Sequence, residues 1–306
     1  MSLAVFLGLA TIDIIFGVDA VPGENQKIVA RRLEILGGGP ATNAAITYAF
    51  LGGSATLVAS VGMHPLADVI RSDLAQFRIS LQDLTPDSYE IPTVASILIS
   101  QASGARTVVS SYARCQPAAA EAFDVSELES ARVLLVDGHQ MTCAIAAAAR
   151  AKALGIPVVL DGGSWKHRTD ELLAHTQIAI CSEDFKPPGT TSLLDVIAYV
   201  RNLGVSAVAI TRGPKSIIWA TEQSNGELPV PSVLSVDTLG AGDIFHGAFC
   251  HRLVSGAAFP DALAFAAKVA AYSCEFAGTR AWMNSWASET STNLPGETPH
   301  PSRAGS

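Results

Sequence analysis

Basic side chains are scarce in this sequence. Lysine and arginine together number 20 in 306 residues, against 28 aspartate and glutamate residues, and the net charge is −8. The longest basic run is Arg31-Arg32. Nucleic acid and anionic membranes bind through clusters of basic side chains, so we expect neither as a partner. A phosphate group would have to be held by local backbone dipoles and magnesium instead.

Cysteine pairs and long apolar runs are also missing. The five cysteines form no Cys-x-x-Cys pair, which argues against a zinc site or a disulfide framework and favours buried free thiols in a reducing compartment. No apolar run approaches the roughly 20 residues that span a bilayer. Residues 3–9 are apolar but lack a basic flank, so we predict a first buried β-strand there rather than a signal peptide. The protein is expected to be soluble and cytoplasmic.

Short apolar runs alternate with alanine-rich amphipathic segments through most of the chain. This alternation predicts an α/β fold with a mostly parallel sheet covered on both faces. Asp137, Asp161 and Thr211 lie at the ends of predicted strands, where a polar residue either caps a helix or contacts a ligand. The predicted strands are 133–137, 157–161, 179–180, 207–211 and 216–219, and the predicted helices are 144–154, 193–203 and 261–276.

Two segments, 14–35 and 91–112, lack long helical faces. Strand-like runs on either side of a turn at 102–105 predict a hairpin in the second segment. We expect the two segments to form a small β-sheet lid, with an extension of the main sheet as the alternative. The α/β core then comprises 1–13, 36–90 and 113–284, and the Ser/Thr/Pro/Gly-rich residues 285–306 are expected to form a disordered tail.

The most informative segment is a turn of small residues, Gly240-Ala241-Gly242, followed by Asp243 and an apolar helical face. Free N–H groups at the start of a helix, together with the helix dipole, favour a bound phosphate. A carboxylate beside an anion pocket disfavours simple binding, but it is where a general base is needed. The segment therefore predicts phosphoryl chemistry, with Asp243 as a helix cap as the alternative.

Residues 237–249 resemble the C-terminal signature of the ribokinase-like (PfkB) carbohydrate kinases, Asp-Thr-x-Gly-Ala-Gly-Asp followed by small and hydrophobic residues. Residues 37–45 resemble the N-terminal Gly-Gly-x-x-x-Asn motif of the same family. The resemblance implies a three-layer sandwich with a β-sheet lid that is often a dimer contact, so a homodimer through the lid is expected. It also implies ATP and Mg²⁺ as cofactors and a small sugar as substrate. Under this resemblance Gly240, Ala241 and Gly242 form the anion hole and Asp243 deprotonates the sugar hydroxyl.

The same resemblance implies a sugar site. Gly38, Gly39 and Asn43 belong to the N-terminal motif, and Asp13 matches a Gly-x-x-x-x-Asp opening, so these residues are expected to bind sugar hydroxyls. Turn capping by Asp13 and helix capping by Asn43 are the alternatives. Lys27 in the lid is a candidate for an anionic group on the substrate, or else a solvated lysine.

The nucleotide side matches the family less well. Thr211 and Gly213 resemble its Thr-x-Gly nucleotide turn, although Ser216 stands where a further glycine is common. The Asn-x-x-Glu motif linked to magnesium is not met, because Ser182 and Phe185 occupy its positions. Magnesium is then expected to contact Glu183 or Asp184 through water. Residues 278–280 are expected to close the adenine side or to form a monovalent-cation loop.

Other functions fit the sequence less well. A Rossmann dehydrogenase lacks its third glycine, and no P-loop motif occurs. We interpret the chain as an ATP-dependent kinase that phosphorylates a primary hydroxyl of a ketose or related sugar. A nucleoside kinase and a non-catalytic sugar- or nucleotide-binding regulator on the same fold stay open. Some segments look like the ketohexokinase branch and others like the sulfofructose kinase branch, and Pro40, where the former has a polar residue, puts fructose itself in doubt.

Overall fold

The computed structural model describes residues 3–100, 102, 106–112 and 118–286. Its centre is a nine-stranded sheet in which β1, flanked by β4 and β8, lies among seven parallel strands. Two pairings at one edge, β11 with β12 and β12 with β13, are antiparallel. In spatial order the strands are β13 (Asn225–Leu228), β12 (Lys215–Thr221), β11 (Ala207–Arg212), β10 (Ile178–Ser182), β9 (Val158–Gly162), β8 (Ala131–Val136), β1 (Leu3–Leu7), β4 (Ser54–Ala59) and β5 (Ser80–Asp83).

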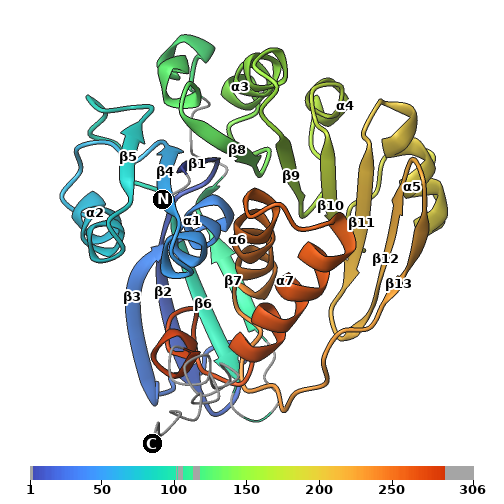
Figure 1. Ribbon diagram of the computed structural model, residues 1–306. Helices are drawn as coiled ribbons and strands as arrows, with labels where there is room; N and C mark the ends of the chain where they lie inside the picture. The colour runs from blue at the N-terminus through green and yellow to red at the C-terminus, as the bar shows by residue number, and fades with distance from the viewer. Residues whose placement is uncertain (1–2, 101, 103–105, 113–117, 287–306) are drawn as a thin grey trace, which may run out of the picture.

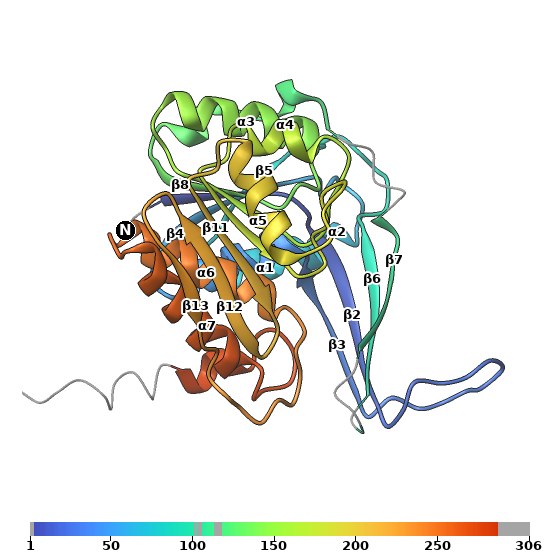
Figure 2. The ribbon, with the colours of Figure 1, turned by 90° about the vertical axis from the view of Figure 1, so that its right-hand side faces the viewer.

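Helices cover both faces of this sheet, as Figures 1 and 2 show. Because the parallel strands are buried on both faces, each face supports its own apolar core, and the core side chains divide into two large clusters. The first face carries α1 (Pro40–Phe50), α2 (Ala67–Gln76), α6 (Ala241–Val254) and α7 (Phe259–Ser273). The second carries α3 (Met141–Ala153), α4 (Thr169–Leu173) and α5 (Leu193–Asn202). The expected three-layer α/β sandwich is confirmed.

A second, four-stranded sheet lies apart from the first, in the order β3 (Arg32–Gly38), β2 (Thr11–Val18), β6 (Val94–Ser100) and β7 (Arg106–Ser110). We call it the lid sheet; it extends from the side of the core in Figure 2. The alternative of an extension of the main sheet is therefore wrong. β2 begins before the expected start of the lid at 14, so Asp13 lies inside a lid strand. β6 and β7 pair as a hairpin, although 103–105 of its predicted turn lie outside the described residues.

The end of the described chain differs from the expected tail. Ser285 and Trp286 are helical rather than disordered. Trp286 is buried and stacks edge-on against Trp282 and Tyr272, which gives this last turn an apolar anchor. The other residues of the predicted tail, 287–306, lie outside the described part of the chain. Among the residues that the structure does describe, no helix combines the length and apolar character needed to cross a membrane.

Helices α1 and α6, neighbours in Figure 1, cross unusually closely at Gly247. A Cβ at this position would lie 2.3 Å from the carbonyl oxygen of Ala44 and 2.8 Å from Cβ of Thr47. Glycine thus lets the two helices approach through their backbones. Since α1 carries Asn43 and α6 carries Asp243, this crossing sets the distance between the two sequence motifs.

We predict that Gly247→Ala lowers the free energy of unfolding by about 1–3 kcal/mol, because the added methyl group overpacks the crossing. Gly163→Ala is the matched control, since a Cβ there meets no atom within 4 Å. Urea unfolding of both variants tests this, and equal stabilities of the two would contradict it.

Candidate active site

The turn before α6 has the geometry of an anion site. Gly240 caps the helix in the left-handed conformation, with φ of 70°. A Cβ there would lie 2.7 Å from Cγ2 of Thr279, so glycine is required both for backbone conformation and for space. The first i→i−4 hydrogen bond of the helix runs from the Ile244 amide to the Gly240 carbonyl, 2.8 Å. The amides of Gly242 and Asp243 come before it and belong to the first turn, where amides have no i−4 carbonyl partner within the helix. The Ala241 amide instead donates to the Thr238 carbonyl at 3.3 Å.

Asp243 lies in the first turn of α6, where the helix dipole favours a carboxylate. The residue is partly exposed, and its Oδ2 accepts a hydrogen bond of 2.8 Å from Nδ2 of Asn43. Burial raises the pKa of this carboxyl to about 7, with a further increase from the nearby Asp161 charge, while the Asn43 hydrogen bond acts in the opposite direction. A carboxylate with a pKa near neutrality can accept a proton from a hydroxyl group.

The N-terminal motif lies directly against this carboxylate. Asn43 is buried within the first turn of α1, close to its N-terminus. Gly39, with φ of 94°, precedes α1, and a Cβ there would lie 2.4 Å from the Leu9 carbonyl oxygen. Gly38 has no room for a Cβ either, because Oδ2 of Asp13 would be 2.0 Å away. The structure therefore brings Asp13, Gly38, Gly39, Asn43 and Asp243 together.

Asp13 is buried on β2, on the same face of the lid sheet as Ile15, which packs with Leu239 of the turn before α6. Its Oδ1 accepts a hydrogen bond of 2.5 Å from the Thr11 hydroxyl. Burial raises the pKa of Asp13, although the Thr11 hydrogen bond and the Arg280 charge favour the ionised form. The strand thus places a second carboxylate near the Gly-Gly motif, where it can accept hydrogen bonds from a polyol.

Arg280 is a site residue whose contacts the sequence did not predict. The expected place of residues 278–280, at the adenine side or in a cation loop, stays a prediction. In the structure, Nη1 of Arg280 donates to Oδ1 of Asn43 at 2.9 Å, and Nη2 donates to the Gly37 carbonyl at 2.9 Å and to Asp73 at 3.2 Å. The sequence held one signal for a role of this residue. Arg280 stands alone as a charged residue in the small and apolar segment 276–283, in a chain with few charges.

Two further buried residues, Asp161 and His246, contact each other near the turn before α6. Nδ1 of His246 lies 2.7 Å from the Gly242 carbonyl and 3.5 Å from Oδ2 of Asp161, and Nε2 lies 3.2 Å from the Ile180 carbonyl. Burial raises the pKa of Asp161, whereas the His246 charge would lower it. The sequence had marked Asp161 as a strand-end residue, but it assigned His246 no role.

The lid sheet contacts the same turn. Leu239 packs against the apolar inner face of the lid, which includes Ile15 and Ile97. Nη1 of Arg106 on β7 donates to the Thr238 carbonyl at 2.9 Å. The position of the lid is thereby tied to the turn that carries the anion site.

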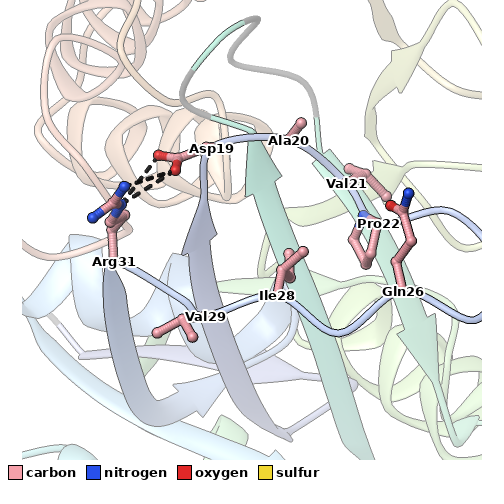
Figure 3. A pocket seen from close by; sticks show the side chains of 8 residues that line it. All are labelled: Asp19, Ala20, Val21, Pro22, Gln26, Ile28, Val29 and Arg31. Atoms are coloured by element: carbon pink, nitrogen blue, oxygen red, sulfur yellow. Dashed lines mark hydrogen bonds and ion pairs between the residues drawn. The ribbon is translucent and has the colours of Figure 1, made fainter.

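Lys27 lies elsewhere, in the exposed loop that joins β2 to β3. This loop follows Val18, five residues of strand beyond Asp13, which corresponds to about 16 Å. An ion pair of 3.0 Å between Asp19 and Arg31 closes the base of the loop beside a shallow pocket (Figure 3). Within one chain, the structure does not bring Lys27 to Asp243.

The nucleotide candidates lie at the carboxyl ends of neighbouring strands. Thr211 is in the last part of β11, and Gly213 follows it with φ of 58°; a Cβ there would meet no atom within 4 Å. Glu183 follows β10; its carboxylate is 3.8 Å from Nζ of Lys215, and Asp184 beside it is exposed. Phe185 is a core residue that packs edge-on against Trp165, so an apolar side chain fills the position that the motif gives to glutamate.

A sequence profile described as pfkB family carbohydrate kinase matches residues 1–286. The chain belongs to the pfkB family of carbohydrate kinases. Ribokinase of Staphylococcus aureus (strain COL) is 26% identical over 270 residues, which cover 81% of this chain and 85% of that protein. Ketohexokinase of Mus musculus is 22% identical over 298 residues, covering 89% and 96%. These relatives support a sugar kinase but do not distinguish the branches of the family.

Solved structures agree on the fold. A putative ribokinase from Agrobacterium tumefaciens superposes with a TM-score of 0.80 at 24% identity, covering 94% of this chain and 99% of that one. A putative ribokinase II from E. coli, solved in complex with ATP and Mg²⁺, gives a TM-score of 0.79 at 18% identity, covering 94% and 100%. The ribokinase-like fold expected from the two motifs is confirmed.

We predict that Asp243→Asn stabilises this pfkB kinase more at high pH than at low pH. Because the folded-state pKa of Asp243 is raised to about 7, the folded state binds this proton more tightly than the unfolded chain does, and stability is lost as the pH rises from about 4 to 7. Asparagine removes that loss, so Tm should rise by about 2–4 °C at pH 8 and by less at pH 5. Thermal melts at both pH values measure this, and an increase that is the same at both would contradict it.

Proposed function

We propose that this protein is an ATP-dependent kinase that phosphorylates a primary hydroxyl group of a small sugar. The observation that carries the proposal is Asp243, a carboxylate with its pKa raised to about 7, in the same helical turn as the amides of an anion site. A phosphate-binding protein would gain nothing from a carboxylate there. Membership of the pfkB family supports this interpretation.

In the proposed mechanism, Asp13 accepts hydrogen bonds from the sugar, and the backbone of Gly38 and Gly39 lies against the sugar. Asn43 acts mainly on Asp243, to which its amide is already bonded. Asp243 removes the proton from the hydroxyl, and the oxygen attacks the γ-phosphorus of ATP in line with the leaving oxygen. The amides of Gly242 and Asp243 stabilise the charge that develops on the transferred group, and the Ala241 amide joins them if it leaves Thr238.

The nucleotide is proposed to lie across the ends of β10 and β11, against Thr211 and Gly213. The described residues contain no cluster of three histidine, cysteine, aspartate or glutamate side chains able to enclose a metal. We therefore propose that Mg²⁺ arrives bound to ATP and keeps several of its waters. Glu183 or Asp184 would contact the ion through those waters. The ion would neutralise phosphate charge. A monovalent cation near residues 278–280 stays a prediction.

The decisive experiment is ADP release from magnesium-ATP in the presence of ketoses, aldoses, sugar acids, sulfo-sugars and nucleosides. We expect one neutral or substituted ketose to raise turnover above the ATPase background. On that compound, Asp243→Asn should lose about 10³-fold or more in kcat with little change in sugar affinity. Unaltered turnover in Asp243→Asn would refute the assignment. A compound that raises Tm without turnover would favour the regulator, and turnover on nucleosides alone would favour a nucleoside kinase.

We also propose that two copies associate through the outer face of the lid sheet. In the strand register, Ile35 pairs with Ile14 and Leu33 pairs with Phe16, so β2 and β3 present four apolar side chains on this face; Ser96 lies between Ile14 and Val109. Leu33 and Ile35 are 56% and 53% exposed, and Val109 on β7 is 66% exposed. Exposed apolar surface of this kind marks an interaction site.

The dimer predicts a particle of twice the 31.8 kDa chain mass in light scattering. Leu33→Glu combined with Val109→Glu should yield monomers, because it places charges in the contact. Leu234→Glu serves as control, since Leu234 is 88% exposed but lies outside the lid. A wild-type monomer, or a dimer that survives the double substitution, would contradict the proposal.

A further inference from the structure

Arg280 connects three elements around the catalytic base. Its guanidinium donates to Asn43 on α1, to the Gly37 carbonyl on β3 and to Asp73 on α2. It also contacts its own neighbour, through a bond of 2.8 Å to the Thr279 hydroxyl. The side chain is mostly buried, and its desolvation lowers the pKa of Arg280, against the charges of Asp73, Asp13 and Asp243. Its position is thus fixed by bonds on several sides.

The contact with Asn43 determines which way the asparagine amide points. Arginine has only N–H donors, so the Asn43 atom that it contacts must be the carbonyl oxygen Oδ1. The other end of the amide, Nδ2, then faces Asp243 and donates the 2.8 Å hydrogen bond. If the amide rotated by half a turn, Oδ1 would face the carboxylate and the two oxygens would repel each other.

The segment that carries Arg280 is itself fastened to the catalytic turn. The Gly278 amide donates to Oδ2 of Asp237 at 2.8 Å, and the Leu239 amide donates to Oδ1 of the same carboxylate at 2.9 Å. A movement of the turn would therefore move Arg280 with it. The segment of Arg280 and the turn before Asp243 are therefore joined through one carboxylate, that of Asp237.

We propose that Arg280 is a positioning residue that orients the Asn43 amide and, through it, the Asp243 carboxylate. The proposal rests on the proposed function only in naming Asp243 as the base; the orientation itself is independent of turnover. Besides Asn43, the groups that act on Asp243 are Asp161 from β9, His246 from α6 and Asp13 from β2. None of these fixes the amide of Asn43.

Arg280→Met tests the proposal. The freed Asn43 amide should lose its fixed orientation, and kcat should fall by about 10- to 100-fold. Asp243 would lose a donor and a nearby positive charge, so the acid limb of the kcat–pH profile should move upward by roughly one pH unit. Arg71→Met is the matched control, because it removes an ion pair to Asp83 and a bond to the Gly62 carbonyl without contacting Asn43. It should leave the acid limb in place.

Two further variants separate orientation from charge and from folding. Arg280→Lys keeps the charge but cannot bond Asn43, Gly37 and Asp73 at once, so it should recover less than half of the lost activity. In an Asn43→Ala background, Arg280→Met should cause no further shift of the acid limb beyond a small charge effect. Full activity of the lysine variant, or shifts that simply add in the double variant, would overturn the proposal. The lysine variant carries the test if the methionine variant does not fold.

The role of Arg280 can also be measured without turnover. The Tm gain from Asp243→Asn grows with pH until the folded-state carboxyl is fully ionised, and the pH at which it levels off should lie roughly one pH unit higher in the Arg280→Met background. An unchanged pH would overturn the role of Arg280 even if the kinase assignment holds. Full turnover of Asp243→Asn would refute the kinase assignment while this shift still tests Arg280.

Discussion

The structure depends on placing several carboxylates close together in a region with little solvent and almost no positive charge. Asp13, Asp161 and Asp243 converge near Arg280 and His246, and burial favours the neutral form of each of these three carboxyl groups. Hydrogen bonds from Thr11 to Asp13 and from Asn43 to Asp243 oppose that tendency, as does the Arg280 charge near Asp13. The resulting balance raises the pKa of Asp243 to about 7, so this carboxyl can change its protonation near neutral pH. A base that works on a hydroxyl group needs this property.

Three glycines permit the close contacts that bring these groups together. Gly247 lets α6 approach α1, Gly240 makes room for Thr279, and Gly38 makes room for Asp13. Each of these contacts brings a side chain or backbone from one segment directly against the backbone of another. A Cβ at any of these glycines would overlap a neighbouring atom, so the segments would have to move apart. The lid takes part as well, because Leu239 and Arg106 connect it to the same turn.

Local patterns in the sequence predicted the elements and the base. The alternation of apolar runs and alanine-rich segments predicted the parallel strands β8 to β11, and the small-residue turn before an apolar helical face predicted the start of α6. The small second sheet followed from segments without helical periodicity. The start of the lid was misjudged, since the buried run around Asp13 fits equally the end of a core strand and the start of a lid strand. Trp286 was predicted to lie in a disordered tail, because the residues after it are mostly polar and the segment was interpreted by its composition. One apolar side chain was enough to hold the start of this segment against the core.

The sequence by itself determined the fold class, the small-residue turn and the carboxylate proposed as the base, because each depends on residues that are neighbours along the chain. Only the tertiary structure decided what surrounds that base. Asn43 and Arg280 are 237 positions apart, and Asn43 and Asp243 are 200 apart, so their hydrogen bonds exist only once β3, α1, α6 and the segment after α7 have packed. The pKa of Asp243 depends on the same packing, since burial and the distance to Asp161 are properties of the folded chain.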